Sequence, residues 1–317
     1  MTFLVLLGLL ALKILGTALR SEVENHLISV LEIKKMQIQN FFSERYGDVK
    51  ILSRNPIIIQ SLPCFSHAYK HGGFSDPSYK QVETEFTPLF IHFLTQQGYQ
   101  NILLVDEEGY VVYGVKNDET LGTNLKTGKF STVTIGEIFK EGLTNLIFSD
   151  LTKSEKTKNF ICLGASPVYD HSNKLIGVVI VEIPYFKLDE ILSQRDGLGK
   201  TGEIYIVGSD KLMRSKSRFL KQNTILELKI DTESSQDALR GNTSVQRIQD
   251  YRNIPVLSAY TPLDKLKDVH WVLLVEKDEK EVLNHSRVLE AYLVVIAAVI
   301  ATISIAYLRF TKKKDIP

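Results

Sequence analysis

Two long apolar stretches, one near each end, dominate the pattern of hydrophobic and polar residues along the chain. The first covers Thr2–Leu19 and is interrupted mainly by Lys13 and Thr17. Its length is close to the roughly 20 residues that a helix needs to cross a bilayer. A cleaved signal peptide is the alternative, but the basic segment that opens a signal peptide is absent and the helical pattern continues past Arg20. The pattern therefore favours a retained membrane anchor.

The second apolar stretch covers Leu289–Phe310 and is rich in Val, Ile and Ala. Arg309 lies at its end, and three lysines follow at residues 312–314. Because Lys and Arg gather on the cytoplasmic side of membrane helices, we expect the C-terminus inside the cell. Two spans then return the N-terminus to the same side. Residues from about Ser21 to Arg287 are therefore expected to face outward.

Between these stretches, the first pattern is helical. Hydrophobic residues recur at steps of about three or four as far as Leu52, and no proline interrupts them before Pro56. A helix of this length far exceeds the globular average of about 11 to 12 residues. It is typical of a membrane span that continues into a stalk, with one face on its own domain and another available to a second copy. The repeating positions are Val23, Leu27, Val30 or Leu31, Ile38, Phe41 or Phe42, Val49 and Leu52.

Beyond this helix the pattern changes. The region Pro63–Pro88 is interpreted as irregular, because it contains paired glycines and an Asp-Pro step. A second helix is expected at Tyr79–Thr95, where Pro88 is tolerated only as a kink. Hydrophobic alternation then predicts strands that form hairpins. The expected strands are Asn101–Val105, Tyr110–Val115, Leu146–Ser149, Phe160–Val168, Leu175–Ile183 and Trp271–Glu276, and the expected short helices are Ile135–Leu143 and Tyr185–Arg195.

The order of hairpins occurs twice along the chain. Ile102–Gly114 (ILLVDEEGYVVYG) is similar to Ile204–Ser215 (IYIVGSDKLMRS). In the same order, Ala165–Pro184 is similar to Ala259–Asp278, and each has a long apolar strand that ends in Val-Glu. Chance similarity between hydrophobic hairpins is the alternative, but the shared order favours a repeated unit. The sequence therefore predicts an α+β protein with antiparallel sheets.

Charge and chemistry exclude several classes of function. The 38 Lys and Arg residues almost balance the 37 Asp and Glu residues, so no strong field attracts nucleic acid. No zinc-protease, hydrolase or kinase motif is visible, and His67 and His71 stand at helical spacing without a ligand cluster. We therefore expect no enzyme, no metal and no cofactor. Cys64 and Cys162 are interpreted as separate thiols, with a disulfide as the alternative.

The stretch Gly197–Phe219 (GLGKTGEIYIVGSDKLMRSKSRF) carries the most specific signal. Its Gly-Lys-Thr imitates a phosphate-binding loop, but a helix precedes it and a strand follows, which is the reverse of the required order. The alternating residues and the turn at 208–210 predict a hairpin, whose second strand starts at Leu212. We interpret Arg214 and Arg218 as partners of acidic residues or of the adjacent helix, with an anion site as the alternative.

The same stretch resembles the junction between the two modules of double-Cache (dCACHE) sensor domains. These are extracytoplasmic domains of bacterial chemoreceptors, sensor kinases and membrane-bound cyclases. The resemblance implies a long N-terminal helix that carries two tandem PAS-like modules between two transmembrane helices. The implied divisions are 1–20 for the first transmembrane helix, 21–98 for the stalk and helical part, 99–184 for the membrane-distal module, 185–285 for the membrane-proximal module, 287–310 for the second transmembrane helix and 311–317 for a cytoplasmic tail.

In this family the small ligand usually lies in the distal module, so the resemblance implies a pocket there. Two lysines in a glycine-containing loop suit an anionic group, two acids suit an ammonium, and two aromatic residues supply apolar walls. Each also has a structural alternative, as a surface charge or a core residue. The expected ligand-binding residues are Tyr113, Lys126, Lys129, Phe130, Ser149, Asp150, Ser166, Asp170 and Glu182.

One departure from the family pattern bears on the ligand. Members that bind amino acids carry an Arg-x-Trp-Tyr run after the second distal strand, and the corresponding segment, Lys126–Phe130, has no Arg, Trp or Tyr. These members also carry an acidic residue at the end of the last distal strand, and Glu182 stands near that place. The ligand class therefore stays open between an organic acid, an amino acid and a nucleobase, and a periplasmic binding protein is a further alternative partner.

The resemblance implies the sensing domain of a two-pass chemoreceptor-type protein, such as a methyl-accepting chemotaxis protein, in the plasma (inner) membrane. We expect a homodimer that pairs through the stalk helix and acts in chemotaxis or signal transduction. Few residues follow the second span, so the output domain is expected outside this chain. The alternatives are the sensor part of a histidine kinase or nucleotide cyclase, a membrane-anchored extracellular enzyme, and an adhesive ectodomain without a ligand.

Overall fold

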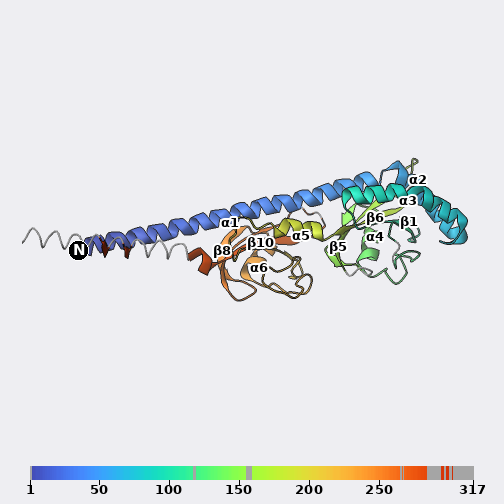
Figure 1. The fold of residues 1–317 in the computed structure, drawn as a ribbon. Coiled ribbons are helices and arrows are strands. Elements are labelled where there is room, and N and C mark those ends of the chain that lie inside the picture. Colours follow the sequence, from blue (N-terminus) through green and yellow to red (C-terminus); the bar gives the residue numbers. More distant parts are fainter. Residues whose placement is uncertain are drawn as a thin grey trace, which may run out of the picture.

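The long helix α1 (Thr2–Leu52) is the axis along which the rest of the molecule is arranged (Figure 1). The computed structural model describes residues 2–116, 119–154, 159–264, 266 and 268–283, together with five single positions between 294 and 302. One face of α1 is buried, and the prediction of a long helix is confirmed. Its buried hydrophobic residues are Leu27, Leu31, Ile38, Phe42, Val49 and Leu52.

Two helices stand where the sequence analysis expected an irregular region. α2 (Pro56–Gly72) and α3 (Pro77–Gln97) each begin at a proline, and the preceding Asn55 and Asp76 accept a hydrogen bond from the helix N-terminus. Proline at the first helical position is favourable, because its missing N–H would have no partner there. The prediction was therefore wrong for residues 63–72 and 77–78, although residues 73–76 are irregular as expected and the helix expected at Tyr79–Thr95 is confirmed. Tertiary packing compensates for the prolines inside both helices.

The first sheet follows these helices and has the strand order β2-β1-β6-β5-β3, with β4 paired to β5 beside it. All of its pairings are antiparallel. Helices α1, α2 and α3 contact one face, and α4 (Thr134–Gly142) packs on the other. The strands are β1 (Asn101–Asp106), β2 (Val111–Gly114), β3 (Ile147–Phe148), β4 (Thr152–Lys153), β5 (Phe160–Tyr169) and β6 (Leu175–Pro184).

The second sheet lies further toward the N-terminal end of α1, beyond the short helix α5 (Phe186–Ser193) (Figure 1). Its order is β7-β10-β9-β8, and α6 (Glu233–Leu239) packs on the face away from α1. The hairpin predicted after Gly202 forms only in part, because residues 212 and 213 make isolated bridges instead of a continuous strand. The strands are β7 (Glu203–Gly208), β8 (Ser244–Gln249), β9 (Pro255–Pro262) and β10 (Trp271–Asp278).

The two sheets repeat one arrangement, as the sequence similarity predicted. The order β1-β6-β5-β3 corresponds to β7-β10-β9-β8. Glu182 of β6 pairs with Asn101 and Leu163, and Glu276 of β10 pairs with Glu203 and Ser258 at the same place in its sheet. We call the first sheet and its α4 the distal module, and the second sheet and its α6 the proximal module.

The hydrophobic core connects these modules instead of separating them. One cluster of buried residues runs along α1 and includes the α1-facing sides of both sheets. Each module has a smaller cluster of its own on the opposite face, beneath α4 or α6. Each module therefore contributes one face of its sheet to the shared core and has a separate core on the other face. The boundary predicted between residues 184 and 185 stays a prediction.

Within the described residues, no helix has both the length and the apolar character needed to cross a bilayer. The span predicted at Leu289–Phe310 lies outside the described residues except for five positions. Most side chains of the span predicted at Thr2–Leu19 also lie outside them. Both spans therefore stay predictions.

Candidate functional site

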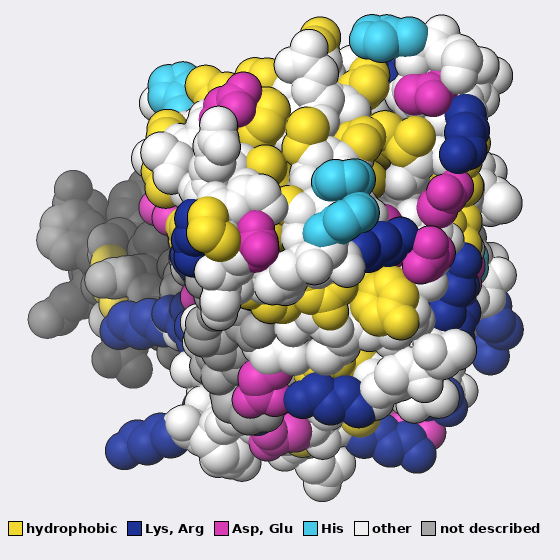
Figure 2. Space-filling view, turned by 90° about the vertical axis from the view of Figure 1, so that its right-hand side faces the viewer, with side chains coloured by type: hydrophobic (Ala, Val, Ile, Leu, Met, Phe, Trp, Pro, Cys, Tyr) yellow, Lys and Arg dark blue, Asp and Glu magenta, His cyan; other side chains and the backbone are white. Residues whose placement is uncertain are grey.

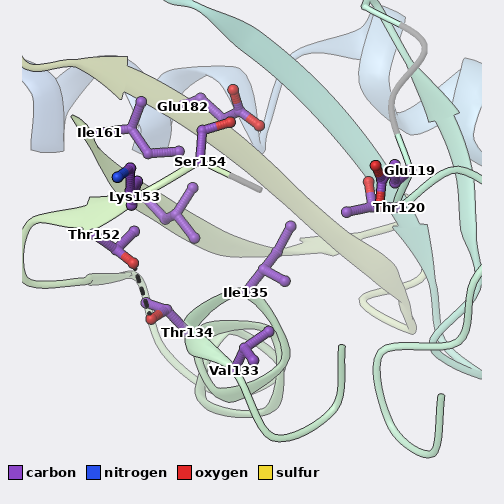
Figure 3. A pocket seen from close by; sticks show the side chains of 11 residues that line it. Glu119, Thr120, Val133, Thr134, Ile135, Thr152, Lys153, Ser154, Ile161 and Glu182 are labelled. Atoms are coloured by element: carbon purple, nitrogen blue, oxygen red, sulfur yellow. Dashed lines mark hydrogen bonds between the residues drawn. The ribbon is translucent and has the colours of Figure 1, made fainter. Parts of the chain in front are cut away.

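A cavity of about 60 Å³ lies in the distal module, between the sheet and the start of α4 (Figure 3). Strand alternation forms its floor, because Ile161, Leu163 and Glu182 all point to the α4 side. The wall opposite is made by the N-terminal end of α4 and by β4. The residues that line the cavity are Glu119, Thr120, Val133, Thr134, Ile135, Thr152, Lys153, Ser154, Ile161, Leu163 and Glu182.

The two sides of the wall are joined by their hydroxyl groups. The Oγ1 atoms of Thr134, at the start of α4, and Thr152, in β4, are 3.3 Å apart and share a hydrogen bond (Figure 3). β4 is only two residues long and is paired with β5 alone. A short edge strand of this kind is the part of the wall that moves at the lowest cost.

The lining suits a small polar ligand with a short apolar part. Glu182 is a buried carboxyl group, with 7% of its surface exposed, and Glu119 and Lys153 add charge at the rim. Four hydroxyl side chains alternate with aliphatic ones from α4 and β5. The volume is well below the roughly 300–1,000 Å³ of typical ligand pockets. A ligand the size of an amino acid therefore exceeds the enclosed space.

Of the nine residues predicted to bind the ligand, only Glu182 lines this cavity. Tyr113 and Ser166 lie on the opposite face of the sheet. The Tyr113 ring stacks on Phe65 with 4.3 Å between ring centroids, and its hydroxyl pairs with Thr87; burial raises its pKa to about 12. The Ser166 hydroxyl donates to Ser53, directly after α1, over 3.0 Å.

Four more of the nine lie near the surface or in the core of the distal module. Lys126 Nζ donates to the carbonyl of Glu107, and Asp170 accepts bonds within its own turn, where the hydrogen bonds of Ser172 lower its pKa. Lys129 is exposed and lies over the ring of Phe130, which is itself buried in the core beneath α4.

The last two, Ser149 and Asp150, lie where the distal module meets the proximal one. Ser149 Oγ accepts a bond from the backbone of Leu163, and the carboxylate of Asp150 is bound by Arg214. The structure thus does not bring the nine residues together in one cavity. Their contacts with a ligand stay predictions.

The sequence analysis missed most of the lining, including Thr134, Thr152 and Ser154. Thr134 begins a helix that was expected one residue later, and the other two lie in the polar segment between two strands. That segment, LTKSEKTKN, shows no hydrophobic alternation. The only signal available was its position between two predicted strands.

Comparison with known proteins agrees with this architecture. The family model dCache_1, described as a Cache domain, matches residues 16–286. The chain belongs to the Cache domain family. A search of curated proteins finds no match.

Solved structures with the same fold are chemoreceptor ligand-binding domains of low sequence identity. This Cache domain is similar to that of the Campylobacter jejuni chemoreceptor Tlp3 in complex with 4-methylisoleucine, with a TM-score of 0.58 and 14% identity over 83% of this chain and 94% of that chain. For Pseudomonas fluorescens CtaA in complex with L-isoleucine, the TM-score is 0.52 at 13% identity over 85% and 98% of the chains. For Pseudomonas aeruginosa PctC in complex with GABA, it is 0.53 at 16% identity over 81% and 100%.

The arginines and cysteines of the Cache domain have structural roles. Arg214 is paired with Asp150 and Asp210, which confirms its interpretation as a partner of acids. Arg218 donates instead to the carbonyl groups of Gly199 and Gly202. Both cysteines are free thiols, as expected. Within the described residues, no three His, Cys, Asp or Glu side chains are grouped to hold a metal ion.

The loop that imitates a phosphate-binding site holds a carboxylate of the protein itself. The backbone N–H groups of Lys200 and Thr201 donate to Glu281 over 3.0 and 2.7 Å, and the Thr201 hydroxyl donates over 2.5 Å. Gly197 and Gly199 have positive φ angles of 80° and 75°, which bend the loop around this group. The loop therefore fixes the segment that follows β10.

The Cache domain also has a groove of about 390 Å³ at the end that carries α2 and α3. Figure 2 looks onto this end and shows hydrophobic side chains gathered among charged ones. Leu89 and Ile91 of α3 and Ile51 of α1 are each more than two-fifths exposed. The groove is lined by Leu52, Asn55, Ile57, Ile58, Leu89, Phe90, His92, Phe93, Gln96 and Gln97.

Proposed function

We propose that this chain is the extracytoplasmic ligand-sensing part of a transmembrane signalling receptor of the chemoreceptor type, and that a small ligand binds in the distal module. The observation that carries the proposal is the cavity between the distal sheet and α4, with the buried Glu182 in its floor. Membership of the Cache family supports the sensing role. The similarity in fold to chemoreceptor ligand-binding domains supports the chemoreceptor type.

The lining favours a ligand that carries a cationic amino group. Among the described lining residues, Glu182 and Glu119 supply two carboxyl groups and Lys153 supplies one amino group, while Lys129 pairs with Glu119 over 3.5 Å. A carboxylate in a largely buried site binds an ammonium group with a charge-assisted hydrogen bond. The ligands named in the similar structures, which include L-isoleucine, L-serine and GABA, all carry such a group. An organic acid would place its carboxylate beside the buried Glu182 and is therefore disfavoured.

The membrane arrangement is part of the same proposal. Thr2–Leu19 and Leu289–Phe310 are the two membrane helices, and the short C-terminal tail with its three lysines is cytoplasmic. The protein would then lie in the plasma (inner) membrane with the Cache domain outside. Two copies would pair along the exposed face of α1, which carries the partly exposed Ile28, Ile33 and Met36.

A thermal-shift screen of the full chain in detergent tests the ligand proposal. The compounds are L-isoleucine, L-serine and GABA as amines, with organic acids and nucleobases as the other classes. A ligand at about 100 times its Kd stabilises the folded state by about 2.7 kcal/mol. We expect at least one amine to raise the melting temperature, and organic acids to leave it unchanged.

Two variants locate the binding event. Glu182→Gln keeps the shape of the side chain but removes its charge, and it should abolish the shift that the amine produces. Lys126→Gln, on the surface of the same module, is the matched control and should retain it. If no compound raises the melting temperature, direct sensing of small ligands is refuted and a periplasmic binding protein becomes the expected partner. If Glu182→Gln keeps the full shift, the ligand binds elsewhere.

A further inference from the structure

Asp150 connects the wall of the distal cavity to the proximal module. Its Oδ1 atom accepts a hydrogen bond from Arg214 Nε over 2.9 Å, and its Oδ2 atom accepts one from Arg214 Nη2 over 2.8 Å. Oδ1 also accepts the indole N–H of Trp271 over 2.8 Å. A carboxylate bound by both arms of a guanidinium is fixed in orientation as well as in position.

We propose that Asp150 is the positioning residue through which occupancy of the distal cavity changes the position of β10. This inference rests on the proposed function, because it gives the same cavity a route to the segment that follows the proximal module. It assigns Asp150 to signal transmission instead of to the ligand contact that its carboxyl group suggested in the sequence.

On the distal side, a segment of the cavity wall begins two residues after Asp150. Thr152, Lys153 and Ser154 all line the cavity and come two to four residues after it. Thr152 is also joined to α4 through Thr134. An outward movement of α4 and β4 to admit a larger ligand therefore displaces the backbone that carries Asp150.

On the proximal side, Asp150 binds the residue with which β10 begins. Trp271 is 1% exposed, and its ring packs edge-on against Phe42 of α1 with 5.5 Å between centroids. A second hydrogen bond also joins the two modules: the backbone N–H of Phe148 donates to Asp268 Oδ2 over 3.0 Å. β10 then leads into the segment that Glu281 fixes to the loop before β7. Movement at Asp150 thus reaches both α1 and the C-terminal side of the domain.

The electrostatics make this connection stiff. The Arg214 side chain is 3% exposed and contacts two acids, Asp150 and Asp210. Burial alone would lower the pKa of Arg214, but hydrogen bonds to both acids raise it above its usual value. The guanidinium therefore stays charged, and it follows the Asp150 carboxylate because a buried charge that loses its partner is costly.

Trp271 provides a direct readout, because it is the only tryptophan in the chain. Its emission depends on the hydrogen bond of the indole and on its exposure. The probe is Thr152→Leu, which places a larger side chain in the cavity wall and stands in for a bound ligand. The matched control is His171→Leu, an exposed position in a turn of the same module. We expect Thr152→Leu to shift the Trp271 emission in the full chain, and His171→Leu to leave it unchanged.

Asp150→Asn tests whether the shift passes through the carboxylate. Asparagine keeps the acceptor for the indole but cannot bind both arms of Arg214. In this background we expect the shift caused by Thr152→Leu to be lost. The inference is overturned if the shift survives in Asp150→Asn, or if Thr152→Leu leaves Trp271 unchanged in a protein with wild-type circular dichroism.

A second measurement does not depend on the folding of Asp150→Asn. Hydrogen exchange of Thr152→Leu against the wild type should change at the β10 amides, residues 271–278, and not at those of β8, residues 244–249. Equal changes at both strands would contradict the route. This outcome can be distinguished from that of the ligand screen. If an amine raises the melting temperature but leaves the Trp271 emission unchanged, only this inference is refuted. If Thr152→Leu shifts the Trp271 emission but no compound raises the melting temperature, only the proposed function is refuted.

Discussion

The distal and proximal modules have the same strand order but differ in the face turned away from α1. In the distal module, Glu182 lies in the floor of a cavity. In the proximal module, the corresponding Glu276 is 2% exposed, and Ser258 and Tyr205 lie beside its carboxylate. The hollow of about 500 Å³ in the proximal module lies along β8, and its described lining does not include Glu276.

Side-chain size also differs at matching positions on this face. Leu103 of β1 corresponds in register to Tyr205 of β7, and Ala165 of β5 corresponds to Tyr260 of β9. Both tyrosines are fully buried, and their rings fill the proximal face. One strand arrangement thus gives a hollow face or a filled face according to a few side chains. The presence of a cavity thus depends on how the module is filled and not on its fold alone.

Truncating the filled face should have the largest effect. Tyr205→Ala removes a fully buried ring and should lower the free energy of unfolding by about 3–5 kcal/mol. Ile135→Ala, at the edge of the distal cavity, should lower it by about 2 kcal/mol, because that site is already partly empty. Urea denaturation followed by circular dichroism measures both values. Equal losses would mean that the two faces are packed alike.

The buried acid should give the proximal module a distinctive pH dependence. Burial, with the nearby Asp250 and Glu203, raises the pKa of Glu276 from the ordinary 4.5 to about 8. The folded state then binds more protons than the unfolded state between these values, so the free energy of unfolding falls as the pH rises from 4.5 to 8. The loss should be on the order of a few kcal/mol.

Glu276→Gln checks this dependence, since an amide does not titrate. Urea denaturation at a series of pH values should show a flatter curve for the variant over that interval. Glu85→Gln, at an exposed position on α3, is the control and should follow the wild type. A variant curve as steep as the wild-type curve would show that Glu276 is ionised in the folded protein.

A smaller effect on the free energy of unfolding is expected in the segments that follow the two modules. After the distal module, Lys34 of α1 donates to the Ile191 carbonyl in α5 over 2.6 Å. After the proximal module, Glu281 accepts its bonds from Lys200 and Thr201 instead. Glu281→Gln should therefore destabilise the protein by about 1–2 kcal/mol at neutral pH.

The pH dependence of this second effect has the opposite sign. Although burial opposes it, the hydrogen bonds of Thr201 and Lys200 lower the pKa of Glu281 below its usual value. Its stabilising contribution is present above the unfolded-state value and is lost as the pH falls through the lower, folded-state value. The difference between Glu281→Gln and the wild type in urea should therefore disappear in acid. Glu85→Gln, at an exposed position on α3, is again the control and should follow the wild type.

The smallest effect is expected at the exposed distal lysines. Lys126→Gln and Lys129→Gln should leave the free energy of unfolding unchanged within error, since exposed ion pairs contribute little. Titration calorimetry with any amine found in the screen should give the same affinity as the wild type. A tenfold loss in either variant would place the ligand on the loop, where the family pattern suggested it, and not in the cavity.

The pattern of residues alone determined the long helix, the strands and their double occurrence. Each of these depends on local periodicity, such as the spacing of Leu27, Leu31 and Ile38 or the Val-Glu at the ends of β6 and β10. Proline and glycine misled the interpretation of α2 and of the first residues of α3, because helix-terminal prolines and internal ones look alike in a sequence.

Only the tertiary structure decided where the site lies. The cavity is the space left between side chains of five separate segments, and no local pattern encodes such a volume. The role of Asp150 depends on Arg214 and Trp271, which are 64 and 121 residues away in the chain. Hydrophobic spacing indicates which face of a helix or strand is buried. The contacts that side chains make across that face are set by tertiary packing, which brings together residues that are far apart in the sequence.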